Sequence, residues 1–236
     1  MAGVTPINNL PAEVLGMVFF EFVELMELEQ TRQGQTPERL TAVCRWWKEL
    51  VESNPELWSR IDVRFGFGNG PIKVEPIRAK IQKAKRSPLA IYFHSRLFTG
   101  DGHLTVTRDV LALYDLIKNH RWRVLSIFEL RYMSPFEIIF RHIIDNPYMC
   151  RLTSFRIGMT AFGPEAEVVG ALVNGALRQN LNIRYLSIPV GLLEPSHPLL
   201  QVVSCLQVHW VSFPKGILSL LSKASSLRSL RVGSLS

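Results

Sequence analysis

The stretch NPELWSRIDV, residues 54–63, marks a change of period in the hydrophobic pattern of the chain. Its first residue precedes a proline and resists the helical backbone region, which ends or restarts the helix before it. Farther on, Ile61 and Val63 alternate with polar residues, as residues of a strand do. The stretch therefore predicts a junction between a helical segment, residues 1–63, and a segment that contains strands, residues 64–236.

Upstream of this junction, apolar residues recur at helical spacing in two segments. The first, LPAEVLGMVFFEFVELMELE, repeats large apolar residues at spacings of one, three and four, and its proline, Pro11, suits a first helical turn. The polar residues 30–38 contain Gly34 and Pro37 and predict a loop. A second helix is expected from about Pro37 to Val51.

Downstream, strand patterns and helix patterns alternate. An apolar triplet, with two residues and then one residue between its members, recurs along the chain. Its copies are Trp58, Ile61, Val63; Trp122, Leu125, Ile127; Leu152, Phe155, Ile157; Ile183, Leu186, Ile188; Val203, Leu206, Val208; and Leu227, Leu230, Val232. The middle residues of the last five copies lie 30, 31, 20 and 24 residues apart, close to the leucine-rich-repeat spacing of roughly 20–29 residues.

These patterns predict an α/β chain with a small all-helical module over residues 1–63. An irregular, leucine-rich-repeat-like solenoid of strands and helices is expected over residues 64–236. An alternating α/β sandwich would contain a similar number of strands and helices and is the alternative. The final stretch, SLRSLRVGSLS, falls inside a repeat, as expected of a fragment or of a degenerate copy.

The sequence also argues against several classes of protein. No run approaches the roughly 18 apolar residues of a membrane span, and the amino-terminal residues do not resemble a signal peptide. The cysteines Cys44, Cys150 and Cys205 are odd in number and far apart, which fits reduced thiols better than disulfides. We therefore expect a soluble intracellular protein, cytoplasmic or nuclear.

Motifs of catalysis and of cofactor binding are missing as well. Neither Gly-x-Ser-x-Gly nor His-Glu-x-x-His occurs, and no cysteine or histidine has a partner at metal-ligand spacing. The glycine-rich residues 66–70 lack the Gly-Lys-Ser/Thr of a phosphate-binding loop. We expect no enzymatic activity, no cofactor and no metal.

The formal charge of +7 is divided unevenly. Residues 1–63 carry ten acids and five bases, a net −5, whereas residues 64–236 carry ten acids and twenty-two bases, a net +12. A positive second segment favours acidic partners or phosphates. Five bases on one helical pattern are the best candidates for nucleic-acid contact, although a solvated helix face would place them in the same way. They are Arg78, Lys80, Lys83, Lys85 and Arg86.

Three elements of the first segment resemble, in the same order, the F-box of the divergent F-box-like proteins of mushroom-forming fungi. INNLPAEVLGMVFF is similar to the opening Leu-Pro-x-Glu-φ-Leu pattern, and VCRWWKEL is similar to Val-Cys-x-x-Trp. NPELWSRI is similar to the closing Pro-x-Leu-Trp element. The resemblance covers residues 7–63.

The resemblance implies a substrate-receptor subunit of an SCF-type ubiquitin ligase. Such proteins bind a Skp-type adaptor, which links them to a cullin-RING ligase, and capture a protein substrate, here expected to be acidic, with the rest of the chain. The residues assigned to the adaptor are Leu10, Pro11, Val14, Leu15, Val18, Val43, Cys44, Trp47, Leu57 and Trp58. The alternative is a basic nucleic-acid-binding or scaffold protein with a degenerate F-box.

Overall fold

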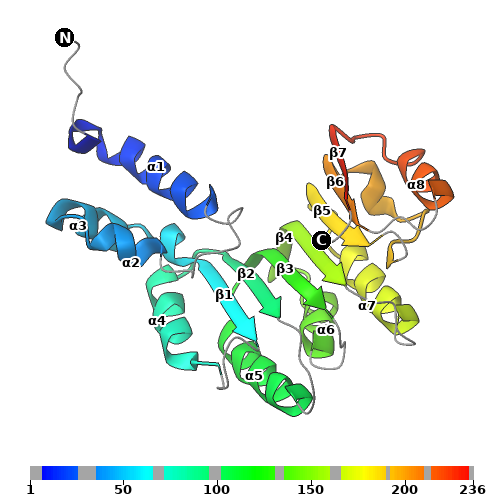
Figure 1. Ribbon diagram of the computed structural model, residues 1–236, viewed down its shortest axis with the longest axis horizontal. Coiled ribbons are helices and arrows are strands. Elements are labelled where there is room, and N and C mark those ends of the chain that lie inside the picture. Colours follow the sequence, from blue (N-terminus) through cyan, green and yellow to red (C-terminus); the bar gives the residue numbers. More distant parts are fainter. Residues whose placement is uncertain are drawn as a thin grey trace, which may run out of the picture.

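The computed structural model describes residues 7–25, 36–65, 72–95, 102–130, 136–159, 166–189, 192–209 and 214–233. Within these residues, seven parallel strands form one sheet, and their order across the sheet is their order in the chain (Figure 1). The strands are β1 Arg60–Phe65, β2 Leu89–Ser95, β3 Trp122–Leu130, β4 Cys150–Met159, β5 Tyr185–Pro189, β6 Cys205–His209 and β7 Ser229–Gly233.

Helices precede the sheet and connect its strands. Before β1 lie η1 Ile7–Asn9, α1 Ala12–Leu25, α2 Thr36–Thr41, α3 Arg45–Ser53 and η2 Pro55–Trp58. Between the strands lie α4 Val74–Ala84, α5 Gly102–Ile117, α6 Glu137–Asp145, α7 Ala166–Arg178, η5 Pro198–Gln201 and α8 Pro214–Leu221. Parallel strands need such crossovers, and Figure 1 shows α4 to α7 along one side of the sheet.

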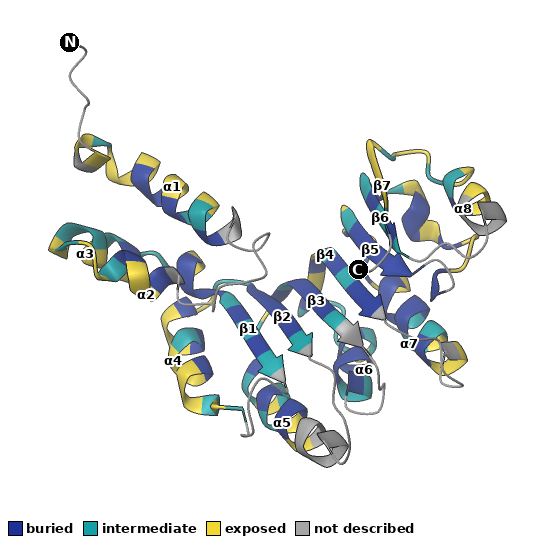
Figure 2. Ribbon diagram, viewed as in Figure 1, coloured by how far each residue is buried: buried dark blue, intermediate teal, exposed yellow. Residues whose placement is uncertain are grey.

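The two faces of the sheet differ in chemistry. Alternate strand residues, such as Ile61 on β1 and Ile91 on β2, join residues of α1 and of α4 to α8 in one hydrophobic core. We call this side the core face, and Figure 2 shows how much of the strands it buries. The intervening residues form the second face, where the buried apolar cluster contains strand residues only, among the residues described.

The expected fold, an all-helical module followed by an irregular repeat solenoid, is wrong. The strands form one continuous all-parallel sheet, and β1 begins at Arg60, inside the segment expected to be all-helical. A single hydrophobic core reaches from Leu15 on α1 to Leu220 on α8. Both architectures alternate strands with helices, so the spacing of apolar residues could not distinguish them.

The second expected helix is two helices. Cys44 has an extended backbone, with φ −159° and ψ 169°, and separates α2 from α3. The helix α3 ends at Ser53, before Asn54 and the proline, as the sequence indicated. Of the expected loop at residues 30–38, residues 30–35 lie outside the described residues, as do the glycine-rich residues 66–70.

Candidate partner-binding site on the first helix

The helix α1 is held to the rest of the protein by one buried side. Leu15, Phe19 and Val23 are spaced by four residues, which places them on one face of the helix, and all three are buried in the core. The Phe19 ring lies 4.6 Å, centroid to centroid, from that of Trp47 on α3. These contacts fix which side of α1 faces away from the core.

The outward side of α1 is also apolar. Val14 is 41 % exposed, Met17 is 69 % exposed and Val18 is 42 % exposed. With Pro11, which is exposed immediately before α1, they follow the spacing of one helix face. We call these four residues the α1 ridge. Side chains of this kind, gathered on one face rather than scattered, are typical of a surface that meets another protein.

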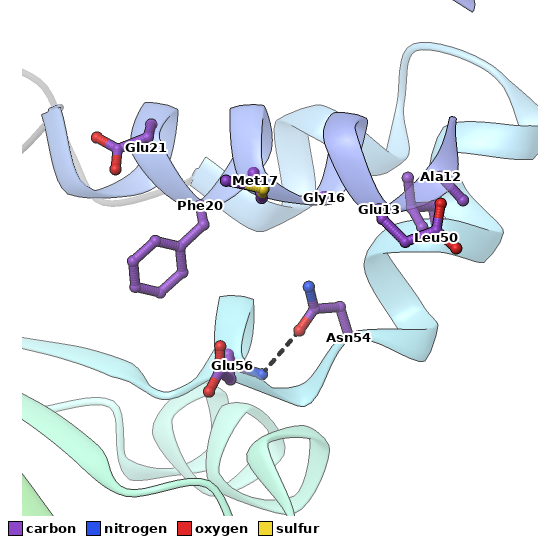
Figure 3. Close-up of a pocket in the computed structure, with 9 residues that line it drawn as sticks. All are labelled: Ala12, Glu13, Gly16, Met17, Phe20, Glu21, Leu50, Asn54 and Glu56. Carbon is purple, nitrogen blue, oxygen red and sulfur yellow. Dashed lines mark hydrogen bonds between the residues drawn. The ribbon is translucent and has the colours of Figure 1, made fainter. Parts of the chain in front are cut away.

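A groove runs beside the α1 ridge, between α1 and the junction of α3 with η2. Its volume is about 490 Å³, and Figure 3 shows its lining residues. They are Ala12, Glu13, Gly16, Met17, Phe20, Glu21, Leu50, Asn54 and Glu56. Three of them are acids and none is basic, so the groove suits an apolar group with basic neighbours.

The ten residues that the resemblance assigns to the adaptor fall into three groups. The exposed ones are Pro11, Val14, Val18 and Val43. The half-buried ones are Leu10, Cys44 and Trp47, and the buried ones are Leu15, Leu57 and Trp58. The buried group lies in the hydrophobic core, so in this conformation its members support the helices that present the exposed group.

Trp58 shows this supporting role. Its Nε1 donates a hydrogen bond to the backbone oxygen of Val51 at 3.0 Å, which links η2 to α3. The Lys83 ammonium on α4 lies 3.7 Å from the centroid of the Trp58 ring. A cation over an aromatic face is attracted to it, so Trp58 also connects the helical segment to α4.

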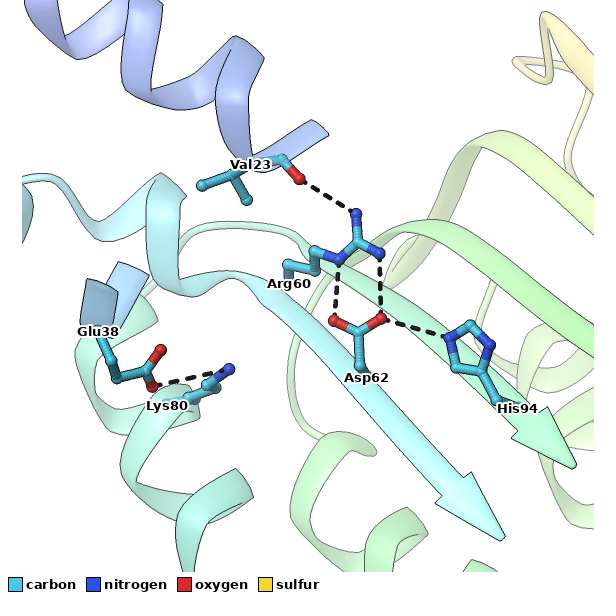
Figure 4. Close-up of polar contacts among 6 residues, drawn as sticks. All are labelled: Val23, Glu38, Arg60, Asp62, Lys80 and His94. Carbon is cyan, nitrogen blue, oxygen red and sulfur yellow. Dashed lines mark hydrogen bonds and ion pairs between the residues drawn. The ribbon is translucent and has the colours of Figure 1, made fainter. Parts of the chain in front are cut away.

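The five bases of the candidate nucleic-acid patch lie on α4 and just after it. Arg78 pairs with Glu75 at 3.5 Å, and Lys80 lies 3.7 Å from Glu38 on α2 (Figure 4). With the contact of Lys83 to Trp58, three of the five interact with other residues of the chain. Lys85 and Arg86 are exposed. Part of this charge therefore serves to attach α4 to the helices before it.

A polar cluster that the sequence analysis did not anticipate joins α1 to the sheet (Figure 4). Arg60 binds Asp62 through two hydrogen bonds of 2.9 Å and 3.1 Å, and its Nη1 donates to the Val23 backbone oxygen at 3.3 Å. His94 Nε2 on β2 lies 3.4 Å from Asp62 Oδ1. Alternation alone could have placed Arg60 and Asp62 on one face, but not His94 beside them.

Burial and hydrogen bonding shift the pKa of Asp62 in opposite directions. Burial raises its pKa, but the hydrogen bonds with His94 and Arg60, together with their charges, lower it further. The net effect holds the pKa of Asp62 well below its usual range. The carboxylate is therefore charged at neutral pH and neutralises a guanidinium that is itself only 13 % exposed.

The described part of the chain gives little support to metal binding or to a reactive thiol at Cys150. There, no cluster of three or more His, Cys, Asp and Glu side chains could hold a metal ion. Burial raises the pKa of the Cys150 thiol to about 12, so the reactive thiolate is suppressed. The described helices are also too short or too polar to cross a membrane.

No protein-family model matches the chain, and no curated protein matches it either. The features of the chain that bear on its function are therefore the α1 ridge, the groove beside it and the motifs that surround them. Among the described residues, the side chains of Val14, Met17 and Val18 on the α1 ridge are exposed although they are apolar.

Proposed function

We propose that the protein is a substrate-receptor subunit of an SCF-type ubiquitin ligase, which binds a Skp-type adaptor through its amino-terminal helices. The observation that carries the proposal is the α1 ridge. It exposes apolar side chains on the same helix whose sequence resembles the opening element of an F-box. In a protein–protein interface, a small number of residues near its centre supply most of the free energy of binding.

The extent of burial assigns two different roles to the residues of the motif. Leu15, Leu57 and Trp58 stabilise the packing of the helices, while Pro11, Val14 and Val18 contact the adaptor. The acids of the neighbouring groove form a polar rim around this apolar centre, as in other interfaces. The alternative of nucleic-acid binding has weaker support, because three of its five candidate bases already contact other residues of the chain.

The test is binding of the full chain to a Skp-type adaptor, measured by co-purification and by isothermal titration calorimetry. The double substitution Val14→Glu, Val18→Glu places two charges on the α1 ridge. We expect it to weaken binding by roughly 100-fold, since each substitution removes an apolar anchor and buries a charge.

The matched control is Val168→Glu with Leu181→Glu. These residues are 58 % and 46 % exposed on and after α7, so the same chemical change occurs far along the chain. The control should keep the affinity of the unmodified chain. Equal affinity of both double variants, with both folded by circular dichroism, would show that the α1 ridge is not the adaptor site.

A further inference from the structure

The edge of the sheet at which the strands begin is a second surface with a distinct composition. All the strands are parallel and follow one another in chain order, so each connection from a helix into β2 to β7 reaches the sheet at this same edge (Figure 1). We call it the amino edge. Six strands spaced by about 4.8 Å give it a length of about 24 Å. Its connections are residues 85–88, 118–121, 146–149, 179–184, 202–204 and 222–228.

The connections of the amino edge carry positive charge only. They hold seven lysines and arginines and no aspartate or glutamate, and Arg151, the second residue of β4, adds an eighth cation. The nearest acids in sequence are Asp115 and Asp145 in the last turns of α5 and α6, and Asp115 pairs with Lys118 at 2.7 Å. The seven are Lys85, Arg86, Lys118, Arg121, Arg184, Lys223 and Arg228.

Three of these cations are exposed and have no ion pair. Arg121, Arg151 and Arg228 are exposed, and none of them pairs with an acid among the residues that the structure describes. Arg184 is exposed too, but its Nη1 donates to the Val202 backbone oxygen at 3.1 Å. The first three can therefore contact a partner without losing an ion pair of the fold.

Backbone pairing arranges these residues along a line. The Leu89 N–H donates to the Arg121 backbone oxygen at 2.7 Å, which places Arg121 beside the start of β2. The Ser204 N–H donates to the Arg184 oxygen at 3.0 Å, and the Arg228 N–H donates to the Ser204 oxygen at 2.8 Å. Arg184 and Arg228 thus lie two strands apart, which is about 10 Å between their backbones. A flexible polyanion that follows the amino edge meets one cation after another.

An exposed aromatic side chain lies on the same edge. Tyr148 is 80 % exposed, and the next residue, Met149, accepts a hydrogen bond from the Trp122 N–H at 2.8 Å. Tyr148 is therefore close along the backbone to both Arg121 and Arg151. In proteins that bind single-stranded nucleic acid, cations contact the phosphates while aromatic rings stack on unpaired nucleobases. The carboxylates of an acidic peptide would use the cations alone.

We propose that the amino edge binds single-stranded nucleic acid, with phosphates on Arg121, Arg151 and Arg228 and a nucleobase stacked on Tyr148. This surface differs from the patch predicted on α4, because only Lys85 and Arg86 belong to both. The activity is additional to adaptor binding and does not depend on it.

The test uses the full chain and a fluorescein-labelled oligouridylate of 20 nucleotides, with fluorescence anisotropy at a series of salt concentrations. The triple substitution Arg121→Gln, Arg151→Gln, Arg228→Gln removes three phosphate contacts. We expect it to weaken binding by at least about tenfold at low salt. It should also reduce the slope of log affinity against log salt by about 2, since each phosphate contact on a single strand contributes about 0.7.

The matched control removes the same charge from three exposed residues outside the amino edge. It should keep both the affinity and the salt slope of the unmodified chain, and circular dichroism checks that both triple variants fold. Equal losses of affinity in the two would show that net charge alone matters, and would overturn the proposal. The control is Arg39→Gln, Lys48→Gln, Lys73→Gln.

Tyr148→Ala tests the stacking contact. It should weaken oligouridylate binding by about tenfold and leave the salt slope unchanged, because stacking releases no counter-ions. Unchanged affinity would overturn the role of Tyr148. A polyglutamate of 20 residues that binds more tightly than the oligouridylate, through the same three arginines, would assign the edge to an acidic protein segment instead.

Adaptor binding separates this proposal from the proposed function. The triple arginine variant should bind the adaptor normally, and the α1 ridge variant should bind the oligouridylate normally. If the unmodified chain binds the oligouridylate but no adaptor, the proposed function fails and the nucleic-acid site stands. If it binds the adaptor but no oligouridylate, the nucleic-acid site fails alone.

Discussion

On the β1–β2 half of the second face, the half-buried Arg60 is hydrogen-bonded to Asp62, with His94 beside them, and its Nη1 donates to the Val23 backbone oxygen on α1. On the β4–β7 half, Arg156 rests on the Tyr185 ring, Arg231 is exposed and the strands contain no acid. The same face of one sheet thus carries an arginine paired with an acid of its own strand at one end, and strands that contain no aspartate or glutamate at the other.

This difference indicates that burial decides whether a charged side chain mainly stabilises the fold or can bind a partner. Removing the counter-ion of a largely desolvated cation is costly, so Asp62 stabilises the packing of Arg60. An exposed arginine such as Arg231 keeps its hydration, so the fold does not require a counter-ion for it. It remains available to a ligand, and substitutions at the two ends should therefore have different consequences.

Asp62→Ala should give the largest effect on stability. It leaves the Arg60 guanidinium buried without a counter-ion and loosens the attachment of α1, so we expect a loss of about 3–5 kcal/mol in the free energy of unfolding. Urea denaturation measures it. The control is Glu194→Ala, which removes an exposed partner of Arg178 and should cost about 1 kcal/mol or less. Similar losses of unfolding free energy in the two variants would contradict the expected difference between a largely buried ion pair and an exposed one.

The stability of the protein should depend on pH differently through Asp62 on β1 and through His209 on β6. The folded pKa of Asp62 lies below its ordinary value of 3.8, so its stabilising contribution is complete at neutral pH and is lost as the pH falls below that value. Relative to Asp62→Asn, the unmodified chain should lose up to about 1.4 kcal/mol per pH unit there. Urea denaturation over a series of acidic buffers measures this slope, and parallel curves for the two proteins would refute it.

His209 on β6 should titrate in a different window. Burial lowers its pKa from 6.5, so the unfolded chain binds a proton first and stability falls as the pH drops below 6.5. Relative to His209→Gln, the unmodified chain should lose stability between neutral and mildly acidic pH, where Asp62 does not yet contribute. A loss confined to the range below the ordinary pKa of Asp62 would contradict this assignment.

Substitution of Ser126 on β3, between the two halves of the sheet, should change the free energy of unfolding least. Its Oγ is buried and has no hydrogen-bond partner among the described residues. Ser126→Ala removes this unsatisfied group and should raise the free energy of unfolding by about 0–1 kcal/mol. Ser187→Ala, which removes the contact with His209, should lower it by about 1 kcal/mol. Thermal denaturation compares the two, and destabilisation by Ser126→Ala would show that its hydroxyl is satisfied.

Local patterns were predictable from the sequence, and their assembly was not. The alternation of Ile61 with Val63 correctly placed a strand at β1, because a strand with one buried face repeats every two residues. The register that joins seven such strands into one sheet depends on contacts between distant residues, which spacing does not encode. The solenoid expected from the same spacing was therefore wrong.

The candidate site was predictable in part for a similar reason. The motif resemblance selected both Val14 and Leu15, yet the first is exposed and the second is fully buried. Both are aliphatic, so hydrophobicity could not say which side of α1 faces the core. The cluster around Arg60 needed the pairing of β1 with β2, which brings Arg64 opposite His94 and so places the imidazole beside Asp62.

The match between chain order and strand order has a consequence for folding. Parallel sheets commonly fold slowly, because partner strands far apart in the chain must first meet. Here each strand pairs only with the strands immediately before and after it in the chain, so each new pairing closes only one connection. The sheet can grow outward from any adjacent pair. Unfolding of the edge strand β7 would therefore leave the pairing of β1 with β2 intact.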